Sequence, residues 1–407
     1  PINSQGKSVK YLTPCKSETK AYLPIGTQVI TEGFKDALAG TLKGGVVTGA
    51  LAGVSHFRKA LKPESKLVII FDADGWQNPQ VFTNLFNAGL YLNGRIQLVP
   101  EIPNQPKAGL CEYFKAGHTA DDYKQLISAA MSPSDFLLEI PKHWQGLSKE
   151  DHEKCTKAIL KLAALHLSKT QVEKLTDVMA ITLKEVEPYL VSVAQKNVNA
   201  LRKSAKFDEI SKLRGGYVWA YINSDKIFKD FMSLVSRFGD KLRFNTLKNQ
   251  IELCNEVLPV GSARVQLSVL YGFQATTKTD FPDIVVQAAE RNSYSPIVEY
   301  LEAVHDQYGS DTEILKDLAF RYFGQDEPIY NRMLVKTLIG AVARAYKPGC
   351  KMDTALILQG KQGARKSTFF KTLAGEDEYF DDSLGSVGEK DEKLKLHTAW
   401  FVEWAEL

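Results

Sequence analysis

The sequence predicts an α/β fold, because strand-like and helix-like segments alternate along much of its 407 residues. Over residues 22–131, short apolar runs are followed by amphipathic stretches, and glycines mark the joins. A further apolar run near residue 356 leads into a glycine-rich loop and another helical stretch. This alternation is typical of βαβ units, in which helices connect neighbouring strands of a parallel sheet. The length is enough for two or three domains.

The first domain is predicted at residues 22–132, after a lead-in segment at 1–21. Its strands are expected in four apolar runs, namely "QVIT", "GVVTG", "KLVIIF" and "RIQLV". Each run is followed by a predicted helix, in the order "FKDALAGTL", "VSHFRKAL", "PQVFTNLFNAGLYL" and "CEYFKAG". Together these segments predict a parallel sheet with helices packed against it.

Residues 133–210 show long helical periodicity, as in "KCTKAILKLAALHL", and predict a helical connector. Residues 211–295 predict an α+β region, with strands at "GYVWAYI" and "RVQLSVL" and a helix at "IFKDFMSLVSRFG". In the last domain, 296–407, helices are expected at "SPIVEYLEAVHDQYG" and "YNRMLVKTLIGAVARAYKPG", and a buried strand at "TALILQG". The chain starts at Pro1 and stops within an apolar segment, so we expect a fragment of a longer protein.

Composition excludes several classes of protein. The net charge is only +3, so a nucleic-acid surface has to come from local basic patches such as Leu201 to Lys206. The five cysteines lie far apart without a C-x-x-C pair, which argues against a zinc ribbon and a disulfide framework. No apolar run reaches the ~18 residues of a membrane span, and no signal peptide is visible. A cytoplasmic protein without a membrane partner is expected.

Three carboxylates follow predicted strands of the first domain. Glu32 comes after "QVIT", while Asp72 and Asp74 come after "KLVIIF" and precede Gly75, which lets the chain turn. Ligands of open α/β sheets bind at the carboxyl ends of the strands. Converging carboxylates repel one another unless a hard divalent cation neutralises them, and oxygen ligands suit Mg²⁺ or Mn²⁺. The alternative is that these acids cap the following helices or lie in solvated turns.

A phosphate-binding loop is predicted in "LQGKQGARKST". Gly360, Lys366 and Ser367 match the pattern G-x-x-x-x-G-K-[ST], but Arg365 replaces the second glycine. In such a loop, backbone N–H groups surround the phosphates, the lysine contacts them, and the hydroxyl binds Mg²⁺. We expect Gly363 to supply the flexibility that an arginine lacks.

Downstream, "WFVEWAEL" places Glu403 and Glu406 after an apolar run. This is the pattern of a Walker B strand, whose carboxylate holds Mg²⁺ and polarises the attacking water. The alternative is the edge of a strand that faces solvent. The predicted cofactors are Mg²⁺ and ATP. The predicted nucleotide-binding residues are Gly360, Gly363, Arg365, Lys366, Ser367 and Thr368.

The motifs "TEGFKDALA", "GALAG" and "FDADG", in that order and spacing, resemble the TOPRIM domain of bacterial-type primases, type IA and II topoisomerases and some nucleases. The resemblance implies that Glu32 is a general acid/base or metal ligand, and that Asp72 and Asp74 are metal ligands. It also implies supporting roles for Lys35 or Asp36.

One position departs from the pattern of related primases, which carry an acid shortly before an "NEYF"-like stretch. This chain has "KAGLCEYFKAG", with Gly109 where the acid is expected and Glu112 as a partial substitute.

The motifs "LQGKQGARKSTFFKTLAG", "YFDDSL", "EKDEKL" and "WFVEWAEL" resemble the virulence-associated protein E family over about residues 245–407. That family consists of P-loop ATPases, here expected to be AAA+/superfamily 3-like, related to phage and plasmid replicative helicases. The resemblance implies Walker B roles for Glu403 and Glu406 and makes the arginine in the loop a tolerated variant. Lys390 and Asp391 form a motif without an assigned role.

Together the two resemblances imply a primase-helicase of a phage, plasmid or mobile element. Such a protein makes RNA primers from ribonucleotides on single-stranded DNA with Mg²⁺ and unwinds DNA with ATP, as a homo-hexamer in its full-length form. One alternative is a defence nuclease that combines a TOPRIM domain with an ATPase. Another is a degenerate TOPRIM domain that only binds single-stranded DNA or positions a partner.

Overall fold

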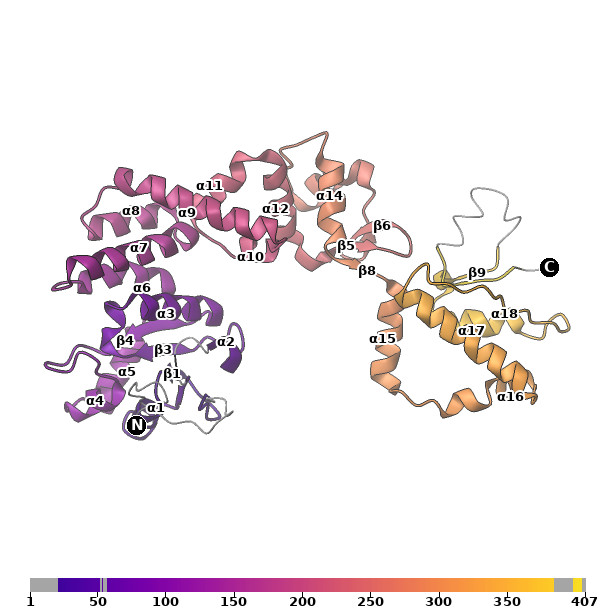
Figure 1. Ribbon diagram of the computed structural model, residues 1–407, viewed down its shortest axis with the longest axis horizontal. Helices are drawn as coiled ribbons and strands as arrows, with labels where there is room; N and C mark the ends of the chain where they lie inside the picture. Colours follow the sequence, from indigo (N-terminus) through magenta and orange to yellow (C-terminus); the bar gives the residue numbers. More distant parts are fainter. Residues whose placement is uncertain (1–20, 52, 54–56, 384–397, 405–407) are drawn as a thin grey trace, which may run out of the picture. The chain divides into compact units, whose positions relative to one another are not determined.

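The computed structural model describes residues 21–51, 53, 57–383 and 398–404. The chain forms two compact units, residues 1–224 and residues 225–407. Figure 1 labels the helices and strands of both units. None of the helices described is both long enough and apolar enough to cross a membrane.

The first unit contains the predicted parallel sheet. Its strands are β1 (Val29–Thr31), β2 (Thr48–Ala50), β3 (Val68–Phe71) and β4 (Arg95–Leu98), in the spatial order β2-β1-β3-β4. All three neighbouring pairs are parallel. The connecting helices are α1 (Phe34–Leu42), α2 (Phe57–Ala60), α3 (Pro79–Leu92), α4 (Leu110–Lys115) and α5 (Ala120–Ser128). The predicted order of strands and helices is confirmed.

Helices cover both faces of this sheet. Val29, Val68 and Ile70 pack with residues of α4 and α5, including Tyr113 and Tyr123, in one buried cluster. Because successive side chains of a strand point to opposite faces, Ile69 and Phe71 face the other side. All four residues of β3 are buried. In Figure 1 the sheet lies between α3 and the group formed by α1, α4 and α5.

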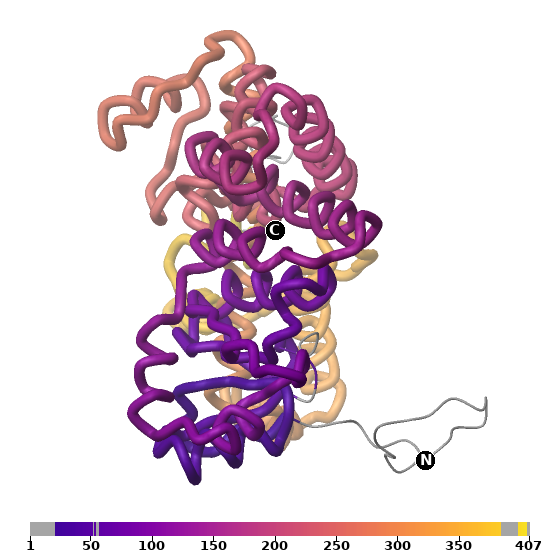
Figure 2. Tube along the Cα trace, turned by 90° about the vertical axis from the view of Figure 1, so that its left-hand side faces the viewer, coloured from indigo at the N-terminus to yellow at the C-terminus, as the bar shows by residue number. Residues whose placement is uncertain are grey.

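The helical periodicity predicted at residues 133–210 is confirmed. The helices here are α6 (Pro133–Glu139), α7 (Lys149–His166), α8 (Lys169–Val178), α9 (Leu183–Lys203) and α10 (Phe207–Ser211), and α11 (Gly216–Ser224) follows them in the same unit. Helices α7, α9 and α11 pack together, and Figure 2 shows the helices of this region as neighbouring coils. His166 ends α7 against α3, with its ring 5.2 Å from that of Phe86. Burial lowers the pKa of His166 to about 4.

The strand predicted at "GYVWAYI" is wrong, since these residues belong to α11. Tyr217, Val218 and Ile222 are buried where α11 packs against α7 and α9. A short, continuous apolar run fits a buried strand and a buried helix equally well, so its pattern did not separate the two.

The second unit begins with an α+β region. Its elements are α12 (Lys226–Phe238), β5 (Leu242–Asn245), β6 (Gln250–Leu253), β7 (Glu256–Val257), α13 (Ala263–Tyr271), α14 (Phe281–Glu290) and β8 (Ser293–Tyr294). The strands form a mixed sheet in the order β7-β6-β5-β8. The helix predicted at "IFKDFMSLVSRFG" is confirmed as α12. The strand predicted at "RVQLSVL" is wrong, because Ala263 and Leu267 are buried four residues apart on one face of α13.

Two aspartates stabilise α12 and its contact with the loop before α14. Asp225 caps the helix by accepting a hydrogen bond of 3.0 Å from the backbone N–H of Phe228. Asp230 is buried and accepts hydrogen bonds from the backbone N–H and hydroxyl groups of Thr276 and Thr277. Burial raises the pKa of Asp230, but these hydrogen bonds outweigh it, so the net pKa lies below its ordinary value. The loop before α14 is thereby tied to α12.

The rest of the second unit contains α15 (Pro296–Tyr308), α16 (Leu318–Phe323), α17 (Pro328–Tyr346), α18 (Lys366–Ala374), β9 (Phe380–Asp381) and β10 (Phe401–Val402). Strands β9 and β10 pair in parallel. The helices predicted before the Pro348-Gly349 break are confirmed as α15 and α17. The buried strand predicted at "TALILQG" is wrong: residues 351–360 form no strand, and Ile357 is 72% exposed. Apolar character alone does not make a strand, because its backbone also needs a paired neighbour.

Candidate functional site

The predicted acidic residues of the first unit lie at one edge of the parallel sheet. Glu32 directly follows β1, and Asp72 directly follows β3, which pairs with β1. Parallel neighbours end at the same edge, so the fold brings the two loops together. Asp74 lies two residues further on, in the short 3₁₀ helix η2 (Ala73–Trp76). Glu32 is exposed, while Asp72 and Asp74 are half-buried.

A fourth carboxylate, Asp36, reaches this edge from α1. Its Oδ1 accepts a hydrogen bond of 2.8 Å from the backbone N–H of Cys111 at the start of α4. A Cβ atom added to Gly109 would lie 2.6 Å from Asp36 Oδ1 and 2.8 Å from Asp72 Oδ1. The two carboxylates therefore face the same point, next to the glycine. From the sequence, Asp36 was predicted only as a supporting group. The signal that could have placed it at this edge was its position four residues after Glu32.

The space around Gly109 limits which side chains can occupy this position, where an acid was expected. No side chain fits at this position without displacing Asp36 or Asp72, because real Cβ atoms do not approach other atoms so closely. Glu112 instead accepts a hydrogen bond of 3.3 Å from the backbone N–H of Gly109 and lies 3.6 Å from Lys115. In this conformation Glu112 serves as a helix cap.

The chemistry of these side chains fits Mg²⁺ or Mn²⁺, since carboxylate oxygens are the ligands that hard cations prefer. Their arrangement fits less well. Asp74 Oδ2 lies 3.8 Å from Lys107 Nζ, and Glu32 is exposed. Among the residues that the structure describes, no group of three or more histidine, cysteine, aspartate or glutamate side chains is arranged to hold a metal ion. The metal roles of Glu32, Asp72 and Asp74 stay predictions.

The predicted phosphate-binding loop precedes α18. Arg365 is the N-cap residue of this helix and has φ 58° and ψ 29°, in the left-handed region. Gly363 also has a positive φ of 80°. Gly363 supplies a left-handed position as expected, but it does so in addition to Arg365 and not in its place. For a residue with a side chain, this conformation costs about 1–2 kcal/mol.

Lys366 folds back over this loop. Its Nζ donates hydrogen bonds to the backbone oxygens of Gly360 at 3.0 Å and Lys361 at 3.2 Å. The ammonium group therefore lies inside the turn that precedes α18. Helix α18 also directs its first backbone N–H groups toward this place, and no side chain caps them. Thr368 lies exposed in the first turn of the helix.

Ser367 and Glu403 come together across the same site. Ser367 Oγ donates a hydrogen bond of 2.8 Å to Glu403 Oε1. Glu403 directly follows β10, and its own backbone N–H donates to Asp381 O at 2.8 Å, at the end of β9. The sequence predicted both residues from separate motifs, and the structure places them in contact.

Some predicted residues of this site cannot be placed. Glu406, Lys390 and Asp391 lie outside the described residues.

Comparison with known proteins gives two similarities. A search of curated proteins found no match. Among solved structures, the crystal structure of the Aquifex aeolicus primase, comprising its zinc-binding and RNA polymerase domains, is similar at 14% identity with a TM-score of 0.25. That similarity covers 39% of this chain and 38% of the primase chain, well under two thirds of either. Residues 301–407, which include the loop, Ser367 and Glu403, match the virulence-associated protein E-like domain family.

Proposed function

We propose that residues 296–407 belong to an ATP-hydrolysing domain. The observation that carries this proposal is the hydrogen bond between Ser367 and Glu403. It joins Ser367, in the first turn of α18 after the glycine-containing loop, to Glu403, which directly follows the parallel strand β10. The match of residues 301–407 to the virulence-associated protein E-like domain supports the same conclusion.

Each residue of this site has a defined task. The backbone N–H groups at the start of α18 bind nucleotide phosphates, and Lys366 adds a positive charge beside them. Ser367 and Glu403 would supply oxygen ligands for Mg²⁺, which would neutralise the charge of the phosphates. Glu403 also orients the attacking water.

The test is ATP hydrolysis by the 407-residue chain and its Lys366→Ala variant. Lys366→Ala should abolish turnover, because the positive charge beside the phosphates is lost. Lys336→Ala, which removes an exposed lysine on α17, is the matched control. Equal turnover in wild type and Lys366→Ala would refute the assignment of the loop.

We propose for the whole chain the role of a primase-helicase in the replication of a phage, plasmid or mobile element. The parallel sheet carries its acids on the loops after β1 and β3, where nucleotidyl transfer needs oxygen ligands for Mg²⁺ or Mn²⁺. Glu32, Asp72 and Asp74 would supply these oxygen ligands. The substrates are ribonucleotides and a single-stranded DNA template.

Primer synthesis on single-stranded DNA with labelled ribonucleotides and Mn²⁺ tests this role. Wild type should form short products that Asp72→Ala does not form. Cleavage of the DNA in place of synthesis would favour the nuclease alternative. DNA binding without either reaction would favour a sheet domain that only binds DNA.

A further inference from the structure

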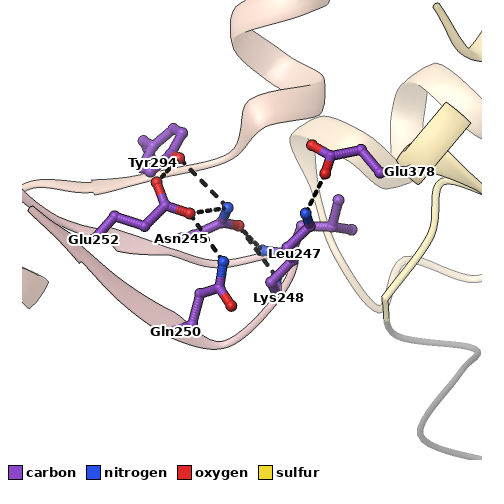
Figure 3. Close-up of polar contacts among 7 residues, drawn as sticks. All are labelled: Asn245, Leu247, Lys248, Gln250, Glu252, Tyr294 and Glu378. Carbon is purple, nitrogen blue, oxygen red and sulfur yellow. Dashed lines mark hydrogen bonds and ion pairs between the residues drawn. The ribbon is translucent and has the colours of Figure 1, made fainter. Parts of the chain in front are cut away.

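A buried polar cluster lies in the hairpin formed by β5 and β6. Glu252 is 8% exposed and accepts hydrogen bonds from Asn245 Nδ2 at 2.8 Å, Gln250 Nε2 at 3.1 Å and the hydroxyl of Tyr294 (Figure 3). Burial raises the pKa of Glu252, but these hydrogen bonds outweigh it and the net pKa lies below its ordinary value. Burial, followed by the contact with Glu252, raises the pKa of Tyr294. The cluster is therefore a carboxylate surrounded by donors.

The same cluster fixes the turn of the hairpin. Asn245 Oδ1 accepts hydrogen bonds from the backbone N–H groups of Leu247 and Lys248, each at 3.1 Å. An asparagine that binds the backbone two and three residues ahead stabilises a turn. Because Asn245 Nδ2 is held by Glu252, the direction of this turn is set by the buried part of the sheet.

The turn contacts the segment that follows α18. Leu247 packs against the buried cluster of Ile297, Ala374 and Tyr379. Lys248 Nζ forms an ion pair with Glu378 Oε2, which Figure 3 shows bridging the hairpin and the neighbouring ribbon. Glu378 and Tyr379 belong to the 3₁₀ helix η7 (Asp377–Tyr379), which leads directly into β9.

Strand β10 depends on this segment for its backbone hydrogen bonds. The N–H of Trp400 donates to Tyr379 O at 2.9 Å, and the N–H of Glu403 donates to Asp381 O at 2.8 Å. The side chain of Glu403 in turn accepts from Ser367. A continuous series of contacts thus runs from the hairpin turn to the candidate nucleotide site.

We propose that Lys248 is a positioning residue of the candidate nucleotide site. Through Glu378 it holds η7 and β9 in the place that sets β10, and so keeps the Glu403 carboxylate opposite Ser367. The inference rests on the proposed nucleotide site for its functional meaning. It makes the β5–β6 hairpin a part of that site's support, although the hairpin precedes the loop by more than a hundred residues.

Hydrogen–deuterium exchange of the nucleotide-free, 407-residue chain tests the contacts without requiring activity. Lys248→Glu sets two negative charges side by side and should make the amides of Trp400 and Glu403 exchange roughly threefold to tenfold faster. Adding Glu378→Lys restores the opposite charges and should restore slow exchange. Lys316→Glu, which reverses an exposed ion pair with Glu313, is the matched control and should leave these amides unchanged.

Turnover provides the second readout. Lys248→Glu should lower kcat for ATP with little change in KM, because Glu403 is misplaced while the phosphate loop is intact. Lys248→Arg and the double exchange with Glu378→Lys should keep the wild-type kcat.

Two outcomes separate this inference from the proposed function. Unchanged exchange at Trp400 and Glu403 in both Lys248→Glu and the milder Glu378→Gln, with an unchanged Tm, would overturn the positioning role. Faster exchange in a chain whose wild type hydrolyses no ATP would support the positioning role and count against the proposed function.

Discussion

The hydroxyl of Ser367 donates a hydrogen bond of 2.8 Å to Glu403, although 36 positions separate the two residues in the sequence. Ser367 is fixed by the first turn of α18, and Glu403 by the backbone ladder between β9 and β10. The ring of Phe370 on α18 lies 5.4 Å from that of Phe401 on β10 and keeps the two elements together. The contact therefore depends on the packing of this unit.

Glu403→Gln should separate nucleotide binding from hydrolysis. Glutamine keeps an oxygen that can accept from Ser367 but lacks the charge that orients and activates water. We expect ATP turnover to fall by about 10²-fold or more, while ATP affinity stays within a small factor. Turnover assays and nucleotide titrations measure the two effects. Glu376→Gln, an exposed change shortly after α18, is the control, and equal losses in both variants would contradict the role of Glu403.

Arg365→Gly should stabilise the second unit by about 0.5–1 kcal/mol. Glycine relieves the left-handed strain at this position, although the gain is reduced because glycine also makes the unfolded chain more flexible. Lys361→Gly, in the same loop without a positive φ, should destabilise by about the same amount. Urea unfolding measures both. A loss of stability in Arg365→Gly would show that the arginine side chain makes a compensating contact.

Gly109→Ala should destabilise the first unit by about 1–3 kcal/mol, because its Cβ would overlap Asp36 and Asp72. Gly109→Asp should cost more, since it adds a negative charge beside two carboxylates. Gly261→Ala is the control, as no atom lies within 4 Å of its added Cβ. Denaturant unfolding of the three variants measures these losses of stability. Equal losses in Gly109→Ala and Gly261→Ala would contradict the crowding at Gly109.

His166 should make the first unit sensitive to mild acid. Its pKa of about 4 in the folded state lies below the ordinary 6.5, so the unfolded chain takes up a proton first as the pH falls. The stability from this residue is complete above pH 6.5 and is lost progressively toward pH 4. By linkage, about 2 kcal/mol should be lost at pH 5.

His166→Phe keeps the ring against Phe86 and removes the titration, so its stability should fall less between pH 7.5 and pH 5 than that of wild type. His152→Gln, an exposed change on the same helix, should behave as wild type does. Urea unfolding at pH 7.5 and pH 5 measures the loss of stability in each variant. An equal loss in wild type and His166→Phe would contradict the effect of burial.

The sequence predicted the parallel sheet well because apolar strands, glycine joins and amphipathic helices all indicated the same βαβ pattern. The prediction was wrong where these signals did not agree. The runs that form α11 and α13 are short and apolar, and their pattern fits a strand as well as a helix. The burial of α11 between helices and of one face of α13 decides that both are helices. "TALILQG" has the composition of a strand, but its backbone pairs with neither β9 nor β10.

The candidate sites show the same limit. Glycine-rich loops and acids after strands are local patterns, so Lys366, Ser367, Glu403 and Asp72 were predicted as site residues. The packing of Asp36 against Gly109 and the contact between Lys248 and Glu378 join distant segments. Such contacts depend on tertiary structure and leave no local pattern in the sequence.

The capping of α12 by Asp225 has a practical consequence for dissecting the protein. The second unit begins with a helix that supplies its own N-cap, and Asp230 ties down the adjoining loop from within the same unit. An expression fragment that starts at residue 225 therefore keeps these stabilising hydrogen bonds. Protein engineers can use this boundary to produce the second unit without rebuilding the start of its first helix.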